Sequence, residues 1–331
     1  MTVWLSFLFA LEAILPIIAL VVIGYIIKRI GMVDQGFCKI ANKLVFRVFL
    51  PVSLFLNVYR IPDIGSIEIG YIVYALAATL AIFLLSIPAV YFFTKHNDRR
   101  GPTLQATFRS NFALVGIPLA GALFGAEGTM IASLLSAAVI PLFNVLAVIS
   151  LSLFSGGTRK PSVKKILLDI VKNPLILSIG AGLVALAVRA LLVRGDIAWR
   201  LTQVGPLFEV LSYLASVATP LALLVLGMQF EFSTAKEMRR EIVFGTAARV
   251  VIAPVLGIGI AFLFFRNTFS GAHFAAFVSL FATPVAVSSV PMTQEMGGNT
   301  PLAGQFVVFT TLLSALSIFI ASFLLRLAGV L

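Results

Sequence analysis

The chain has 331 residues, of which 60% are hydrophobic and 11% charged, and its mean hydropathy is +1.09. Soluble domains are about half apolar and about a quarter charged, so this composition indicates an integral membrane protein. The formal net charge of +11 does not indicate nucleic-acid binding, because most of the basic residues gather on one predicted side of the membrane.

Long, mostly uncharged segments follow one another along the chain, each long enough to cross about 30 Å of hydrocarbon as a helix. They predict ten transmembrane helices, at residues 4–27, 40–59, 67–93, 104–124, 129–154, 166–193, 207–230, 242–265, 274–296 and 302–330. The distribution of Lys and Arg then places both termini on the periplasmic or extracellular side.

The predicted spans divide into two halves of five, on either side of the basic connection at 155–165. An odd number of spans per half gives the second half the opposite orientation. The halves are also weakly similar, because Pro51 aligns with Pro220 and Pro118 with Pro291 at nearly equal separations. We therefore predict an all-α fold of two inverted five-helix repeats, residues 1–155 and 156–331.

Two predicted spans, the fourth and the ninth, are interrupted. They contain "NFALVGIPLAGALFGAEG" at 111–128 and "ATPVAVSSVPMTQEMGGN" at 282–299. A lone proline in a membrane helix is most often only a kink, but here polar side chains cluster around both interruptions. Interrupted spans at corresponding places in two repeats indicate a transporter site near the midplane. The helix N-termini at the breaks suit an anionic substrate.

Five polar side chains in or beside these spans are candidate substrate ligands, each with a structural alternative. Any of them could instead satisfy its own helix or a neighbouring one. The five are Asn111, Asn144, Ser288, Ser289 and Gln305.

Ionisable residues inside predicted spans are functional candidates by default, and four of them could serve as coupling or anion-attracting residues. Glu12 and Glu295 could carry a coupling proton, although Glu295 is close enough to the cytoplasmic end to reach solvent. Arg109 and Arg249 could attract an anion, or could extend to the lipid headgroups.

The motifs "NFALVGIPL", followed by "LFG", and "TPVAVSS", followed by "EMGGN", resemble the fourth-span and ninth-span motifs of the auxin efflux carrier family. This family includes plant PIN-FORMED carriers and bacterial malate or malonate permeases. The resemblance covers the whole chain, and the short central loop is of the bacterial type. Bacterial relatives often have Asn where this chain has Ser288.

The resemblance implies the fold of the bile-acid sodium symporters. Spans 1, 2, 6 and 7 would form a scaffold, and spans 3–5 and 8–10 a mobile transport domain with spans four and nine crossed at its centre. Carried over by motif, the crossing lies near Gly116–Pro118 and near Pro284, and Asn111 occupies the amide position of the family motif.

We therefore expect a secondary transporter in the cell membrane, of the bacterial inner-membrane type, that moves a small organic anion by elevator-type alternating access. The resemblance favours a malonate- or malate-like acid, with an auxin-like acid as the second choice. The residues are also compatible with a sodium- or proton-coupled symporter or antiporter, and with a non-transporting receptor or channel on the same scaffold. The apolar scaffold face would also allow a homodimer.

No enzyme activity, cofactor or metal is expected from the sequence. It contains no phosphate-binding P-loop and no metal-ligand spacing of His, Cys and carboxylates. Its single cysteine, Cys38, excludes an internal disulfide.

Overall fold

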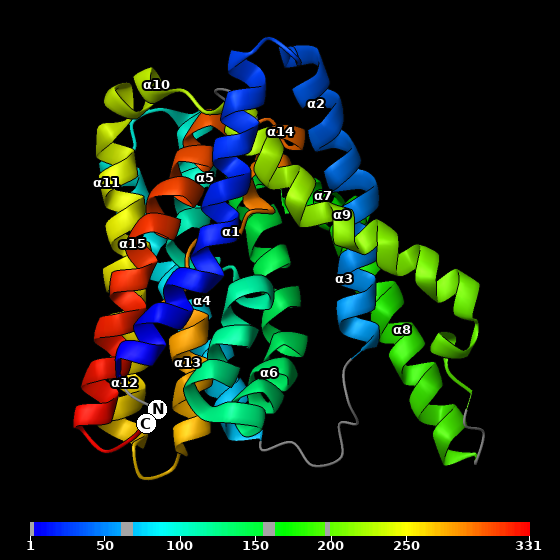
Figure 1. The fold of residues 1–331 in the computed structure, drawn as a ribbon, viewed down its shortest axis with the longest axis vertical. Coiled ribbons are helices and arrows are strands. Elements are labelled where there is room, and N and C mark those ends of the chain that lie inside the picture. Colours follow the sequence, from blue (N-terminus) through cyan, green and yellow to red (C-terminus); the bar gives the residue numbers. More distant parts are fainter. Residues whose placement is uncertain (1–2, 61–68, 155–162, 196–198) are drawn as a thin grey trace.

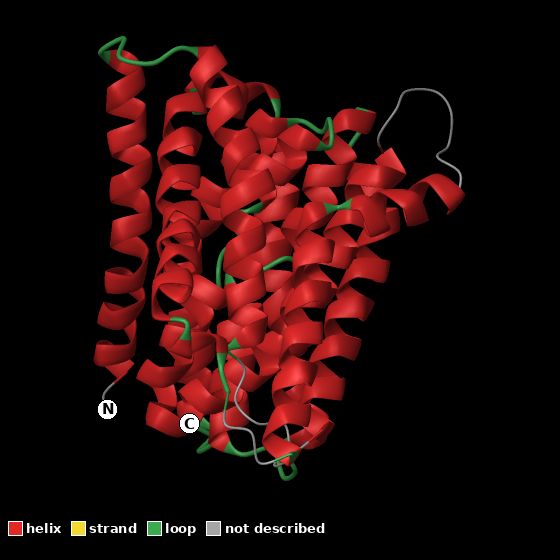
Figure 2. Cartoon of the chain, turned by 90° about the vertical axis from the view of Figure 1, so that its right-hand side faces the viewer, coloured by secondary structure: helices red, strands yellow, loops and turns green. Residues whose placement is uncertain are grey.

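The computed structural model describes residues 3–60, 69–154, 163–195 and 199–331. Within these ranges every regular element is a helix (Figure 2). Seven of the helices are long and apolar enough to cross a membrane, which confirms the all-helical membrane class. The ten spans and their inverted repeat remain predictions.

The first half of the chain contains helices α1 to α6, with π-helical turns labelled η1 and η3. Their bounds are α1 (Val3–Arg29), α2 (Gln35–Leu44), η1 (Val45–Phe49), α3 (Leu50–Tyr59), α4 (Ile69–Phe93), α5 (Asn97–Phe108), η3 (Phe112–Gly116) and α6 (Ile117–Phe154).

The second half contains α7 to α15, with one 3-10 turn, η4, and two π-helical turns, η5 and η6. The bounds are α7 (Val163–Lys172), α8 (Pro174–Arg194), η4 (Leu201–Gln203), α9 (Gly205–Gln229), α10 (Phe232–Glu237), α11 (Arg239–Ala247), η5 (Ala248–Ile252), η6 (Val255–Gly259), α12 (Ile260–Phe265), α13 (Gly271–Phe281), α14 (Ser289–Glu295) and α15 (Thr300–Leu327).

Helices α3, α8 and α9 form one side of the molecule (Figure 1), and α1 packs along α9; we call these four helices the panel. Two glycines bring the backbones of α1 and α9 into contact. A Cβ atom on Gly24 would collide with the backbone oxygen of Leu224, and one on Gly227 with that of Val21. Small residues at such positions are what allows membrane helices to pack closely.

The long helix that starts at η3 is divided by a sharp kink. Gly125 has φ +66° and ψ −149°, a conformation that a residue with a Cβ atom rarely adopts. The kink separates two helical arms, 112–123 and 126–154. The first arm corresponds to the end of the fourth predicted span, and the second arm corresponds to the fifth.

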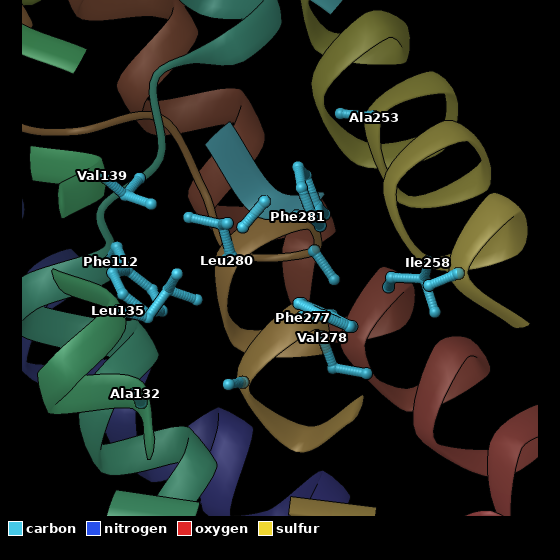
Figure 3. Packing of buried hydrophobic residues seen from close by; sticks show 14 of the residues in the cluster. Phe112, Ala132, Leu135, Val139, Ala253, Ile258, Phe277, Val278, Leu280 and Phe281 are labelled. Carbon is cyan, nitrogen blue, oxygen red and sulfur yellow. The ribbon is translucent and has the colours of Figure 1, made fainter. Parts of the chain in front are cut away.

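Helix α13 lies in the middle of the largest buried apolar cluster (Figure 3). Phe277 and Phe281 of α13 pack between Phe112 and Leu135 of the long helix on one side and Ile258 of η6 on the other. This packing holds the ends of α13 and of the long helix in fixed positions. The two interruptions in the helices lie beside this cluster.

Different helices lie at the two ends of the molecule. The start of α1 and the end of α15 lie at one end, whereas α2, α10 and α14 lie at the other (Figure 1). Short loop segments also interrupt the helices midway between these ends (Figure 2). The midway position is where the sequence predicted a site.

Candidate substrate-binding site

Two helix interruptions pair with each other in the interior. Helix α5 ends at Phe108 and η3 begins at Phe112, while α13 ends at Phe281 and α14 begins at Ser289. Ser110 and Val285 form an antiparallel bridge between the two segments. The backbone N–H of Asn111 donates to Pro284 O (2.8 Å), and that of Ala286 donates to Arg109 O (3.2 Å). We call residues 109–111 and 282–288 the crossing.

The two breaks have different local causes. Pro284 disfavours a helical conformation at the preceding residue, so α13 ends shortly before it. The segment 109–111 contains neither proline nor glycine, and its polar side chains, which can bond locally, weaken the helix there.

The break in the fourth predicted span lies at 109–111 and not at Gly116–Pro118, where the resemblance placed it. Pro118 is tolerated because it directly follows the π-helical turn η3, whose altered hydrogen bonding accommodates a residue without an N–H group. Gly116 has a packing role, because a Cβ atom there would lie 2.8 Å from the backbone oxygen of Ser279 in α13.

The side chain of Arg109 is buried at the crossing, with 2% of the residue exposed. Its Nη1 donates to Gln105 Oε1 (2.7 Å) and to Met292 Sδ (3.1 Å). Its Nη2 donates to Asn144 Oδ1 and Ser288 Oγ, each at 3.0 Å. All four partners are neutral, and in the described part of the chain no carboxylate forms an ion pair with Arg109. The structure therefore holds a buried positive charge that its described neighbours do not compensate.

Arg109 is one of the residues that line a cavity of about 90 Å³ between the panel and the crossing. The panel contributes Leu50, Ser53, Leu54, Asn57, Ala218, Thr219 and Ala222. The other wall is formed by Arg109, Ser110, Asn111, Phe112, Ala113, Leu114, Ile140, Phe143, Asn144, Ala286, Val287 and Ser288. None of these lining residues is acidic.

Several hydrogen-bond donors in the cavity wall lack a partner within the described residues. Asn111 is 5% exposed and Ser110 4% exposed, and neither the Asn111 Nδ2 nor the Ser110 Oγ has a hydrogen-bond partner. The first backbone bond into the long helix is from Val115 N to Asn111 O. The N–H groups of residues 112–114, which line the cavity, thus have no acceptor within the helix.

The structure brings together some of the sequence-predicted ligands and leaves others apart. Asn111, Asn144 and Ser288 line the cavity, and Pro284 lies at the crossing behind them. Ser289 donates to Ala286 O in its own turn, and Gln305 donates to Glu231 O (3.0 Å) at the end that carries α14.

Glu295 also lies at the end that carries α14, where it forms an ion pair with Arg47 at 3.2 Å. An amide cluster lies beside this pair: Asn42 Nδ2 donates to Gln294 Oε1 (2.7 Å) and to Gln229 Oε1 (3.1 Å). These contacts tie α14 to α2 and η1, and through Gln229 to α9 of the panel. The side chain of Glu12 lies outside the described part of the structure.

The sequence left the roles of both intramembrane arginines open. Arg109 and Arg249 are buried, with 2% and 0% exposed, so neither extends to lipid headgroups.

The polar residues that the panel contributes to the cavity were not predicted from the sequence. Ser53 and Asn57 are four residues apart and therefore share one face of α3, which is the pattern that could have indicated them.

Comparison with known proteins gives one family. The model of the family described as "Membrane transport protein" matches residues 9–153 and 158–322. An "Uncharacterized transporter" of Methanothermobacter thermautotrophicus is 23% identical over 94% of this chain and 97% of its own length. A "Putative malonate transporter" of Rhizobium meliloti is 25% identical over 95% of both chains. The chain therefore belongs to the Membrane transport protein family, which is the auxin efflux carrier family that its sequence resembles.

Proposed function

We propose that this protein is a secondary transporter for a small organic anion, and that the carboxylate binds at Arg109 in the cavity beside the crossing. The observation that carries the proposal is the buried guanidinium of Arg109, a residue that lines the cavity and has only neutral partners among the described residues. A buried charge is costly unless it is paired. An anionic substrate would supply the missing charge.

The other donors of the wall suit the same ligand. The Asn111 Nδ2, the Ser110 hydroxyl and the free N–H groups of 112–114 can donate to carboxylate oxygens. The positive end of the long helix adds to their attraction for an anion. Helix α14 has only seven residues, so we assign the substrate to the N-terminus of the long helix alone.

A short dicarboxylate such as malonate or malate is our first candidate substrate. The cavity is small, and its far wall carries the polar side chains of Ser53, Asn57 and Thr219, which could bind a second carboxylate. The relative described as a malonate transporter supports the same choice. An auxin-like acid has a larger apolar ring and only one carboxylate, and is our second candidate.

We further propose that the crossing moves relative to the panel, so that the cavity opens to each side in turn. The location of the cavity between these two parts supports this mechanism, because relative motion there would change its access. The amide cluster and the Arg47–Glu295 pair would close the end that carries α14. We assign that end to the cytoplasm, because α2, α10 and the start of α11 bring Lys and Arg residues there.

Counterflow in proteoliposomes tests the proposal. Radiolabelled malonate, malate and indole acetate would be tested with the wild type, with Asn111→Ala and with Asn267→Ala. The last variant is a matched control, since Asn267 is an exposed amide in the loop after α12. We expect saturable exchange of one acid, reduced by about tenfold in Asn111→Ala and unchanged in Asn267→Ala.

Two other results would correct the proposal at different points. Exchange that survives intact in Asn111→Ala would remove this amide from the site while keeping the carrier. No exchange of any of the three acids by folded wild type would contradict the proposed substrate class.

A further inference from the structure

Arg249 lies at the crossing but is not among the residues that line the cavity, and its partners differ from those of Arg109. It belongs to η5, is fully buried, and among the described residues donates to backbone carbonyl oxygens only. Its Nε bonds Thr283 O (2.8 Å), and its Nη1 bonds Phe108 O (3.1 Å). Its Nη2 bonds Leu280 O (2.7 Å) and Phe281 O (3.1 Å).

Three of these four carbonyl oxygens come from the two helix ends that precede the breaks, and the fourth, that of Thr283, lies in the crossing just after α13. Phe108 is the last residue of α5, and Leu280 and Phe281 are the last two residues of α13. The last carbonyls of a helix have no partner within it, and each helix end carries a partial charge of about −0.5. Two such ends meeting at one point amount to about one negative charge, which the single guanidinium neutralises.

Carbonyl oxygens at half-helix C-terminal ends and unwound backbone are the groups that bind coupling Na⁺ in other carriers with broken helices. Here the Arg249 side chain occupies this kind of carbonyl cluster. No carboxylate forms an ion pair with Arg249 among the described residues. A second cation at this point would therefore find no negative charge left to bind it, because the guanidinium already neutralises the two helix ends.

We propose that Arg249 is a built-in cation that takes the place of a coupling metal ion at the crossing. The inference rests on the proposed transport function and deepens it, because it predicts that substrate transport does not require Na⁺. Arg249 acts as a positioning residue: it fixes the ends of α5 and α13, and thereby the backbone that places Arg109 and Asn111 at the cavity.

Removing the Arg249 side chain and adding free guanidinium ion in its place tests this role. Arg249→Ala leaves a space lined by the four carbonyls, which guanidinium ion can enter and refill. Urea is the matched control, because it has nearly the same shape and can donate hydrogen bonds but has no charge. Both would be added at low, non-denaturing concentrations to purified wild type and variant.

Thermal unfolding gives a readout that needs no substrate. We expect guanidinium to raise the unfolding temperature of Arg249→Ala, urea to leave it unchanged, and neither to stabilise the wild type. In proteoliposomes, guanidinium should restore the transport rate of Arg249→Ala by about tenfold or more. Wild-type transport should be the same when Na⁺ is replaced by N-methylglucamine.

Opposite results would overturn the inference. Equal effects of urea and guanidinium would show that charge is irrelevant at this position, and Na⁺-dependent transport by the wild type would show that a metal ion is still needed. If Arg249→Ala does not fold, Arg249→Lys and Arg249→Gln replace it. Lys must then retain more stability than Gln, because equal losses would contradict a cation role.

The two proposals can fail separately. Absence of transport for every acid tested would count against the proposed function, while the unfolding results with guanidinium would still decide the role of Arg249.

Discussion

Two places at the crossing use the same residue type for opposite purposes. Arg109 lines the cavity, bonds to neutral side chains and leaves its charge uncompensated by the described residues. Arg249 faces the helix ends, bonds to four backbone carbonyls and has no exposed surface. The partners, and not the burial, therefore distinguish a ligand-binding charge from a structural one.

This difference has an energetic consequence. Arg249 stabilises the folded crossing, because buried carbonyls without donors are costly. Arg109 contributes less to folding, since a desolvated charge with neutral partners is only partly stabilised. The charge of Arg109 is expected to stabilise the protein mainly when the anion is bound.

Substituting each arginine by methionine should separate the two roles most strongly. We expect Arg249→Met to lower the free energy of unfolding by about 3–5 kcal/mol, because several buried acceptors lose their donor. Arg109→Met should lower it by about 1 kcal/mol or less, because two of its partners, Asn144 and Ser288, line a cavity and can turn toward water. Thermal or denaturant unfolding of the purified variants measures both, and equal losses would contradict the comparison.

Replacing Arg109 by lysine tests whether the planar shape of the guanidinium matters in addition to its charge. Lysine keeps the charge but loses the planar fork that contacts Asn144 and Ser288 on one side and Gln105 on the other. We expect KM for the acid to rise about tenfold, with a smaller change in maximal rate. Arg266→Lys, an exposed arginine at the end of α12, is the control and should behave like the wild type.

Two buried amides provide a finer test of the cavity boundary. Asn144 contacts Arg109 in the cavity, whereas Gln305 contacts Glu231 O near the end that carries α14. Asn144→Ala should raise KM about fivefold, the equivalent of one hydrogen bond of about 1 kcal/mol, and Gln305→Ala should leave KM unchanged. If both substitutions raise KM equally, the cavity does not define the site.

The smallest effect is expected at the ion pair between α14 and η1. The Arg47–Glu295 pair is largely exposed on the Arg47 side, and such pairs contribute about 0–1 kcal/mol. Glu295→Gln should therefore change exchange rates by less than about threefold. A loss of exchange as large as that of a cavity variant would instead give Glu295 the coupling role that the sequence left open.

The sequence predicted those features that depend on local composition. The hydrophobic segments predicted the helices, and the motif shared with the family placed the crossing near Pro284. The polar residues Asn111 and Ser288 indicated the two segments that pair with each other in the structure. Each of these features depends on residues that are neighbours in the chain.

Features that depend on distant partners could not be predicted. Gly116 and Pro118 form a conspicuous motif, yet the break occurs at 109–111, because the π-helical turn accommodates the proline and Gly116 serves the contact with α13. The roles of Arg109 and Arg249 depend on residues from other helices, so a single sequence does not distinguish them. Long-range packing decides both cases.

Competition binding between acids and their amides tests the central claim most directly. Malonate and malonamide, or indole acetate and indole acetamide, have nearly the same shape but differ in charge. We predict that purified wild type binds one of the two acids at least about tenfold more tightly than its amide. Arg109→Gln should lose that preference while still folding. Equal binding of acid and amide by the wild type, or an undiminished preference in Arg109→Gln, would contradict an anion site at Arg109.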